Sequence, residues 1–293
     1  MLKKLLYIVF FLAGLLCLVL AHLVNTVINR PNFVEPGRLK DTNFKEFSAV
    51  TSDGIHIHAA FYEGAAEAAT VLLCHGHGVN MNYMDDMVGF LRVAGYNLLL
   101  LDFRAHGRSG GKLSPIGLHE WKDIKAVLKK AKELGYLKDG MGLAAYGRSM
   151  GAASLLNGAA ELPEITTLIL ESSFAKLRMV AANDAFHAIW LPDTPFSDLG
   201  IWLASMLTGI NYAGNQPVEQ AKHLGDRAVF LIHNELDSRA DLTQYKMLVE
   251  RIPQATTWTS PKSWHVCAHK KNPGEFENRV LDFLYQSGVK GRR

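Results

Sequence analysis

Short, uninterrupted apolar runs alternate with longer amphipathic stretches over most of the chain. Two segments of alternating apolar and polar residues around Ser52, Asp53 and Gly54 predict a β-hairpin within residues 44–64. Beyond the hairpin, the apolar runs predict strands within TVLLCHG at 70–76, YNLLLLDF at 96–103, MGLAAYG at 141–147, TTLILESS at 166–173, AVFLIHNELD at 228–237 and ATTWTS at 255–260. Helices are expected at 81–93, 118–134, from 150 onward, 242–251 and 273–285.

This alternation predicts the fold class. Strands that are apolar throughout are typical of parallel sheets, because helices cover both faces of such a sheet. We therefore predict an α/β protein with a mainly parallel central sheet and helices on both faces. Residues 44–293 are long enough to form one such domain.

The first segment of the chain is apolar for longer than the core of a typical signal peptide. Residues 5–21 lack charged and strongly polar side chains, and the run continues past His22 to residue 24. A helix of this length spans the roughly 30 Å hydrocarbon core of a bilayer, so we predict a transmembrane signal anchor at 1–24 and a linker at 25–43. Lys3 and Lys4 favour a cytoplasmic N-terminus, which predicts a single-pass, membrane-anchored protein with an extracytoplasmic main domain. Secretion after signal cleavage is the alternative.

Composition narrows the classes of ligand. The net charge is +3, and the 20% of charged residues are spread along the chain without the basic stripe typical of nucleic-acid binding. The three cysteines have no metal-ligand spacing and form no disulfide framework. His56 and His58 share one face of the predicted hairpin, but no third metal ligand is indicated, so we expect solvated polar side chains there. We expect no nucleic-acid partner, no metal and no organic cofactor.

The sequence GRSMG at 147–151 places Ser149 between two glycines. This pattern joins a predicted strand to a predicted helix, and the glycines permit a sharp turn that exposes the serine hydroxyl above the sheet. An alcohol is a poor nucleophile at neutral pH, so it needs a base, and the base needs an acid that orients it. We therefore predict that Ser149 is a catalytic nucleophile.

Candidates for the acid and the base follow Ser149 along the chain. Asp237 lies in the loop after a late predicted strand, and His265 directly follows the last one. Glu235 lies in the same loop as Asp237 and is the alternative acid. His269 is the alternative base, but we prefer His265 because it lies next to the strand.

Five motifs in this order resemble those of the α/β-hydrolase superfamily, particularly its small membrane-anchored bacterial serine hydrolases. The similar segments are the His-Gly oxyanion loop LLCHGHG at 72–78, the loop LDFRAHGRSGG at 101–111, the nucleophile elbow GRSMG, the acid loop IHNELD at 232–237 and the base loop WH at 264–265. Ala105 and Asn234 depart from the family because they stand where glycine is common. The resemblance implies an α/β-hydrolase fold with a small helical cap insertion, preceded here by the transmembrane helix.

The resemblance also implies roles for these residues. His265 would take the proton of Ser149, Ser149 would attack an acyl carbonyl, and Asp237 would hold the imidazole. The backbone N–H groups of His77 and Met150 are the expected oxyanion donors. The other polar residues of these loops are expected to be structural: His75, Asp102, Arg104 and His106.

Residues 175–222 are rich in apolar side chains and are expected to form the cap. They could line a pocket for an acyl chain or pack over the sheet. We predict a serine hydrolase that cleaves a carboxylic ester or thioester of a small-molecule or lipid-like acyl substrate, with the membrane as a second partner. An amidase or peptidase with the same triad, and a catalytically silent membrane-anchored binding domain, are the alternatives. Cys74 and Cys267 are expected to be buried thiols.

Overall fold

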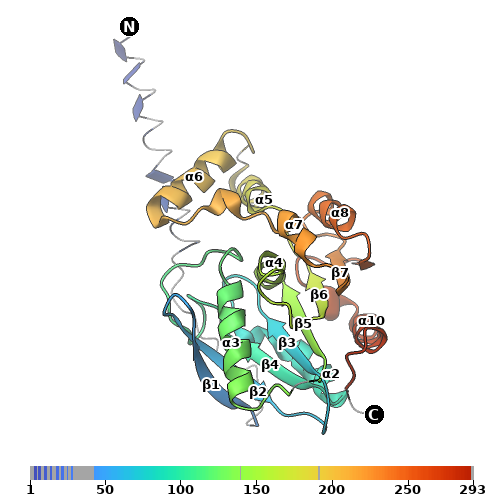
Figure 1. Cartoon of the computed structure of the whole chain (residues 1–293). Coiled ribbons are helices and arrows are strands. Elements are labelled where there is room, and N and C mark those ends of the chain that lie inside the picture. The colour runs from blue at the N-terminus through green and yellow to red at the C-terminus, as the bar shows by residue number, and fades with distance from the viewer. Residues whose placement is uncertain are drawn as a thin grey trace.

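The computed structural model describes residues 43–138, 140–190 and 192–291, together with scattered positions between 3 and 28. Within these residues a single eight-stranded sheet has the order β1-β2-β4-β3-β5-β6-β7-β8 (Figure 1). The strands are β1 Lys45–Val50, β2 His56–Tyr62, β3 Thr70–Cys74, β4 Asn97–Leu101, β5 Leu143–Arg148, β6 Thr167–Glu171, β7 Ala228–Asn234 and β8 Thr256–Ser260. The prediction of a mainly parallel sheet is confirmed.

The direction of the strands gathers their carboxyl ends along one edge of the sheet. β2 is antiparallel to β1 and β4, whereas all pairs from β4 to β8 are parallel. The register places Cys74 opposite Gly147, Arg148 opposite Glu171, and Glu171 opposite Ile232. Loops that follow different parallel strands therefore meet at the same edge, which is where open α/β sheets bind ligands.

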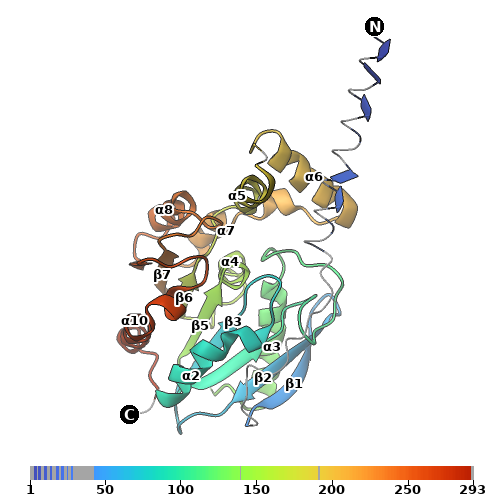
Figure 2. The ribbon, with the colours of Figure 1, turned by 180° about the vertical axis from the view of Figure 1, so that it is seen from behind.

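Helices cover both faces of the sheet. Their bounds are η1 Met81–Met84, α2 Asp85–Val93, α3 Trp121–Glu133, α4 Met150–Asn157, α5 Leu177–Ile189, α6 Phe196–Thr208, η2 Tyr212–Gly214, α7 Pro217–Gln220, η3 Ala221–His223, α8 Leu242–Arg251, α9 Ala268–Lys271 and α10 Pro273–Gln286. Helices α3, α4 and α8 pack on one face, and α2 and α10 pack on the other, which faces the viewer in Figure 2. Each face therefore has its own apolar core.

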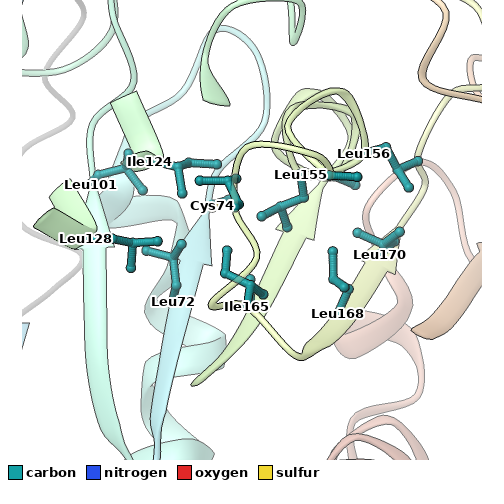
Figure 3. Packing of buried hydrophobic residues seen from close by; sticks show 14 of the residues in the cluster. Leu72, Cys74, Leu101, Ile124, Leu128, Leu155, Leu156, Ile165, Leu168 and Leu170 are labelled. Atoms are coloured by element: carbon teal, nitrogen blue, oxygen red, sulfur yellow. The ribbon is translucent and has the colours of Figure 1, made fainter. Parts of the chain in front are cut away.

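The core under α3 and α4 shows how the sequence pattern becomes packing (Figure 3). Leu72 and Leu101 from the sheet point toward Ile124 and Leu128 of α3, while Leu155 of α4 packs over the same layer. All five side chains are buried. Burial of one such side chain contributes about 1.5–3 kcal/mol, so this face fixes the position of α4 and, with it, the residue before α4.

Between β6 and β7 the chain leaves the sheet and forms α5 and α6. Both helices lie beyond the carboxyl ends of the strands, on the side of the molecule opposite the C-terminus (Figure 1). They pack against one another, and both contact η2. We call α5 and α6 the cap helices. The limits predicted for the domain, 44–293, and for the cap insertion, 175–222, stay predictions.

The membrane-anchored, extracytoplasmic location expected from the N-terminal sequence is wrong as it stands. A span needs one continuous apolar helix of about 20 residues, and among the described residues no helix is both long and apolar enough to cross a bilayer. Much of the anchor expected at 1–24 and of the linker expected at 25–43 lies outside the described residues.

Candidate active site

Ser149 occupies the turn between β5 and α4 in a backbone conformation that few residues adopt. Its φ is +50° and its ψ is −113°. A Cβ on Gly147 would come within 2.6 Å of the backbone nitrogen of Ala152, and one on Gly151 would overlap the carbonyl of Cys74. The two glycines therefore allow the elbow to lie against β3, and the tight turn places the serine at the end of β5.

The structure brings the other two predicted residues to this serine. Ser149 Oγ lies 2.9 Å from His265 Nε2, and His265 Nδ1 lies 2.8 Å from Asp237 Oδ2. The carboxylate can accept only from a protonated nitrogen, so Nδ1–H donates to Asp237 and Nε2 is free to accept the serine proton. The three side chains thus form one directed hydrogen-bonded chain.

Asp237 is held as an ionised group. Its Oδ1 accepts hydrogen bonds from the backbone N–H groups of Arg239 and Ala240, each at 3.0 Å. Burial by itself would raise the pKa of the Asp237 carboxyl, but the hydrogen bond from His265 and its charge, together with the Ser172 hydroxyl and the Arg239 N–H, outweigh burial and lower that pKa below its usual value. The carboxylate therefore keeps its charge next to the imidazole.

The two alternative residues have different partners. Glu235 is exposed and accepts a hydrogen bond from the backbone N–H of Lys262 at 2.6 Å. His269 Nε2 lies 2.8 Å from Glu277, and its Nδ1 lies 3.6 Å from Asp86. Both rivals thus bond outside the chain that ends on Ser149.

The predicted oxyanion donors lie beside Ser149. His77 and Met150 both line the cavity that contains Ser149. The neighbouring His75 accepts from the backbone N–H of Phe103 at 3.0 Å through Nε2, so its Nδ1 donates to the carbonyl of Gly76 at 2.7 Å. Burial lowers the pKa of His75 to about 4, which keeps this imidazole neutral. Because the Gly76 carbonyl and the His77 N–H belong to one planar peptide, His75 also fixes the direction of that N–H.

The two departures from the family motifs have separate structural consequences. Ala105 has a φ of +58°, and its backbone N–H donates to the carbonyl of Gly110 at 2.8 Å. An alanine in this left-handed conformation costs about 1–2 kcal/mol, so the loop keeps its shape at some cost in stability. Asn234 does not have a positive φ, and its side chain bonds Ser172 and Glu171.

The loop from 101 to 111 is held from beneath by buried charges. Arg104 donates to Asp123 at 2.7 Å and to Asp53 at 2.8 Å. Asp102 accepts from the backbone N–H groups of Met81 and Arg108. These contacts hold the loop next to Ser149, and the expectation that the residues take no part in the reaction stays a prediction.

A cavity of about 910 Å³ opens over Ser149. Its walls come from the oxyanion loop, the cap helices and the base loop. The apolar lining is formed by Ile28, Val79, Ile116, Phe174, Leu177, Val180, Ile201, Ala204 and Tyr212. The polar part of the lining includes Asp85, Asp86, Arg148, His269 and Lys270. The cap region was expected either to line a pocket or to pack over the sheet. It does both, because Leu177 and Ala204 are buried and also line the cavity.

The two described cysteines are free thiols. Burial raises the pKa of Cys74, and burial together with Glu171 raises that of Cys267. Both thiols are thus protonated at neutral pH and are poor nucleophiles. Among the residues that the structure describes, no group of three or more His, Cys, Asp or Glu side chains is placed to hold a metal ion.

The sheet order and the elbow define an α/β-hydrolase. The chain belongs to the hydrolase family described as serine aminopeptidase, S33, whose sequence profile matches residues 65–229. Its relatives include the uncharacterized protein YqkD of Bacillus subtilis (strain 168), which is 27% identical over 220 residues, or 73% of this chain and 70% of that protein. The uncharacterized protein YfhR of Escherichia coli (strain K12) is 27% identical over 131 residues, and the match spans 44% of this chain and 45% of that relative.

Solved structures show the same fold. The Pyrococcus furiosus esterase Pf2001 is 26% identical, with a TM-score of 0.75 over 89% of this chain and 98% of that one. The acylaminoacyl peptidase of Pyrococcus horikoshii has a TM-score of 0.66, but it is 17% identical and only 42% of its chain is covered. This second likeness concerns the fold alone.

Proposed function

We propose that this hydrolase cleaves carboxylic esters or thioesters through an acyl-enzyme on Ser149. The observation that carries the proposal is the hydrogen-bonded chain from Ser149 through His265 to Asp237, with distances of 2.9 and 2.8 Å. Ser149, at one end of this hydrogen-bonded chain, lines a cavity large enough for an acyl substrate. Similarity to the esterase Pf2001 at 26% identity supports an ester as the substrate.

In the first half of the reaction, Ser149 Oγ attacks the acyl carbonyl carbon while its proton moves to His265 Nε2. Asp237 stabilises the imidazolium that forms. The carbonyl oxygen becomes an oxyanion and accepts hydrogen bonds from the backbone N–H groups of His77 and Met150. When the tetrahedral intermediate collapses, the bond to the leaving group breaks and His265 gives its proton to the alkoxide or thiolate.

In the second half, a water molecule replaces the leaving group. His265 Nε2 takes a proton from that water, and the resulting hydroxide attacks the acyl carbon of the ester on Ser149. The second tetrahedral intermediate collapses, the proton on His265 returns to Ser149 Oγ, and the carboxylic acid leaves. The apolar wall formed by Leu177, Ile201 and Ala204 is the part of the cavity suited to the acyl group.

An amide or peptide substrate is the second candidate, because the family is described as a serine aminopeptidase. The same three side chains would perform that reaction. A matched pair of substrates separates the two candidates. If the p-nitrophenyl ester of an acyl group is hydrolysed and its p-nitroanilide is not, the ester is favoured; the opposite result favours the amide.

The test of the nucleophile is covalent labelling with a fluorophosphonate probe. Wild-type protein should be labelled stoichiometrically and Ser149→Ala should not be labelled. The matched control is Ser287→Ala, because Ser287 lies at the end of α10 and bonds only to the carbonyls of Phe283 and Leu284. Labelling of Ser149→Ala at the wild-type level would refute the assignment, and a folded wild type that neither labels nor hydrolyses any substrate would favour a silent binding domain.

A further inference from the structure

Glu171 is a buried carboxylate at the carboxyl end of β6, and no sequence motif identified it as a candidate site residue. It follows four buried residues of the same strand and has an exposed fraction of 0%. It does not line the cavity. A carboxylate buried this completely is costly unless hydrogen bonds and a positive charge compensate it, so its partners indicate why it is there.

Both oxygens of Glu171 accept hydrogen bonds from other segments. Oε2 accepts from Arg148 Nε at 3.1 Å and from the hydroxyl of Tyr146. Oε1 accepts from Asn234 Nδ2 at 3.2 Å and from the backbone N–H of Ala268 at 3.0 Å. The four donors therefore come from three separate parts of the chain.

Each of these parts carries one residue of the proposed triad. Arg148 directly precedes Ser149, whose backbone N–H also donates to the Glu171 carbonyl at 2.9 Å. Asn234 ends β7, and its carbonyl accepts the backbone N–H of Asp237 at 2.9 Å. Ala268 begins α9, three residues after His265. Glu171 is thus the point where the nucleophile, acid and base loops are joined.

The charges around Glu171 stabilise its contacts with the residues before Ser149. Burial alone would lower the pKa of the Arg148 guanidinium, but Tyr146, Asp86 and Glu171 raise it well above its usual value, so Arg148 stays charged. Its other nitrogens donate to Asp86 at 2.9 and 2.6 Å, which ties the elbow to α2. Burial and the neighbouring carboxylates raise the pKa of Tyr146, which therefore remains a neutral donor.

From these contacts we propose that Glu171 is a positioning residue, which sets the distance and direction between Ser149, His265 and Asp237 without touching the substrate. The proposal rests on the proposed function for its kinetic consequence. The proposal includes a role for Asn234. This residue stands where the family commonly has glycine, and its side chain connects the acid loop to Glu171.

The test uses Glu171→Gln in the full chain, with Glu120→Gln as the matched control. Glu120 is also a glutamate with an exposed fraction of 0%, but its side chain bonds Ser114, Gly117 and His119 rather than the triad loops. A shift of about 1 Å in catalytic geometry can cost about 100-fold in rate, so we expect Glu171→Gln to lose kcat on this scale while KM changes by less than about threefold. The control is compared on kcat, which it should keep, because Glu120 supports the segment that contains the cavity residue Ile116.

A second readout does not depend on turnover. In protein with ¹⁵N-labelled histidine, the Nδ1–H proton of His265 that bonds to Asp237 should give a downfield resonance, which Glu171→Gln should shift or broaden and Glu120→Gln should preserve. If Glu171→Gln folds and keeps both the wild-type kcat and this resonance, the proposal is overturned. If wild type shows the resonance but neither labels nor hydrolyses a substrate, the proposed function fails while the resonance still decides the positioning role.

Should Glu171→Gln not fold, Tyr146→Phe gives the same decision. It removes one donor to Oε2 and keeps the buried ring. We expect a smaller loss of kcat and a smaller change of the His265 resonance. Wild-type values of both in folded Tyr146→Phe would overturn the proposal.

Discussion

The backbone of Ser149 is the most constrained feature of the candidate site. Residues in such sparsely populated conformations cost about 1–3 kcal/mol and persist only when their surroundings hold them. Here the backbone N–H of Ser149 donates to the backbone carbonyl of Glu171, and the carbonyl of Ser149 accepts from the N–H of Ala153 at 3.0 Å. The tight packing at Gly147 and Gly151 leaves no room for larger residues. The backbone geometry of Ser149 is therefore fixed by its surroundings alone.

At the same scale, Asp237→Asn tests the acid. An asparagine can donate to His265 Nδ1 and so favours the wrong imidazole tautomer, which costs about 10⁴-fold in kcat in serine proteases. We expect a loss of that order in the hydrolysis of p-nitrophenyl esters. The matched control is Glu235→Gln in the same loop, which should keep the wild-type kcat. Equal losses in the two variants would contradict the assignment of Asp237.

Among the elements, the cap helices decide the shape of the cavity. Ile201 and Ala204 on α6 line it, whereas Trp202 and Met206 on the same helix are exposed. Helix α5 is tied to the acid loop, because Asp184 pairs with Arg239 through two hydrogen bonds of 2.7 and 2.6 Å. The cap thus forms part of the apolar wall of the cavity and also contacts the loop that carries Asp237.

Ala204→Phe should therefore change substrate selection. The added ring would fill part of the cavity next to Tyr212 and Ile201, so kcat/KM for a long-chain p-nitrophenyl ester should fall at least about tenfold relative to the butyrate ester, on the scale of pocket discrimination. Met206→Phe places the same side chain on the exposed face of α6 and serves as the control. If both variants keep the wild-type ratio, the acyl group does not bind against α6.

Across the whole molecule, the loops at the strand ends depend on buried carboxylates. Glu120 supports the segment of residues 114–119, and Asp123 holds Arg104. Burial, with a further contribution from Asp123, raises the pKa of Glu120 to about 7. Burial likewise raises the pKa of Asp123 to about 6, although Arg104 opposes this shift. These groups make the stability of the fold depend on pH near neutrality.

The sign of this dependence follows from the raised pKa of Glu120. The folded state binds the proton more tightly than the unfolded chain, so the stability from this group is complete below its ordinary pKa and is lost as pH rises through about 7. For Glu120 the loss is about 3 kcal/mol. The free energy of unfolding, measured with urea at pH 5, 6, 7 and 8, should decrease with rising pH by less in Glu120→Gln than in wild type. Parallel curves would show that Glu120 is not the group responsible.

The sequence alone predicted the strands, the helices outside the cap region that cover the sheet, and the order of the motifs. Apolar runs such as TVLLCHG at 70–76 are typical of strands in a sheet whose two faces are covered, so local composition indicated where the strands lie. The GRSMG turn predicted the elbow for a similar reason, because the steric need for its glycines is local. The chain order of Ser149, Asp237 and His265 predicted the triad, whose catalytic roles stay a prediction.

Contacts between distant segments were decided only by the tertiary structure. Glu235 and Asp237 lie in the same loop, and only the fold shows that Asp237 faces His265 while Glu235 bonds Lys262. Glu171 had no local signal, because its partners are far away along the chain and reach it only when β5, β6 and β7 lie side by side. A hydrogen bond depends on position and direction in space, whereas a sequence pattern reports only the periodicity and sterics of neighbouring residues.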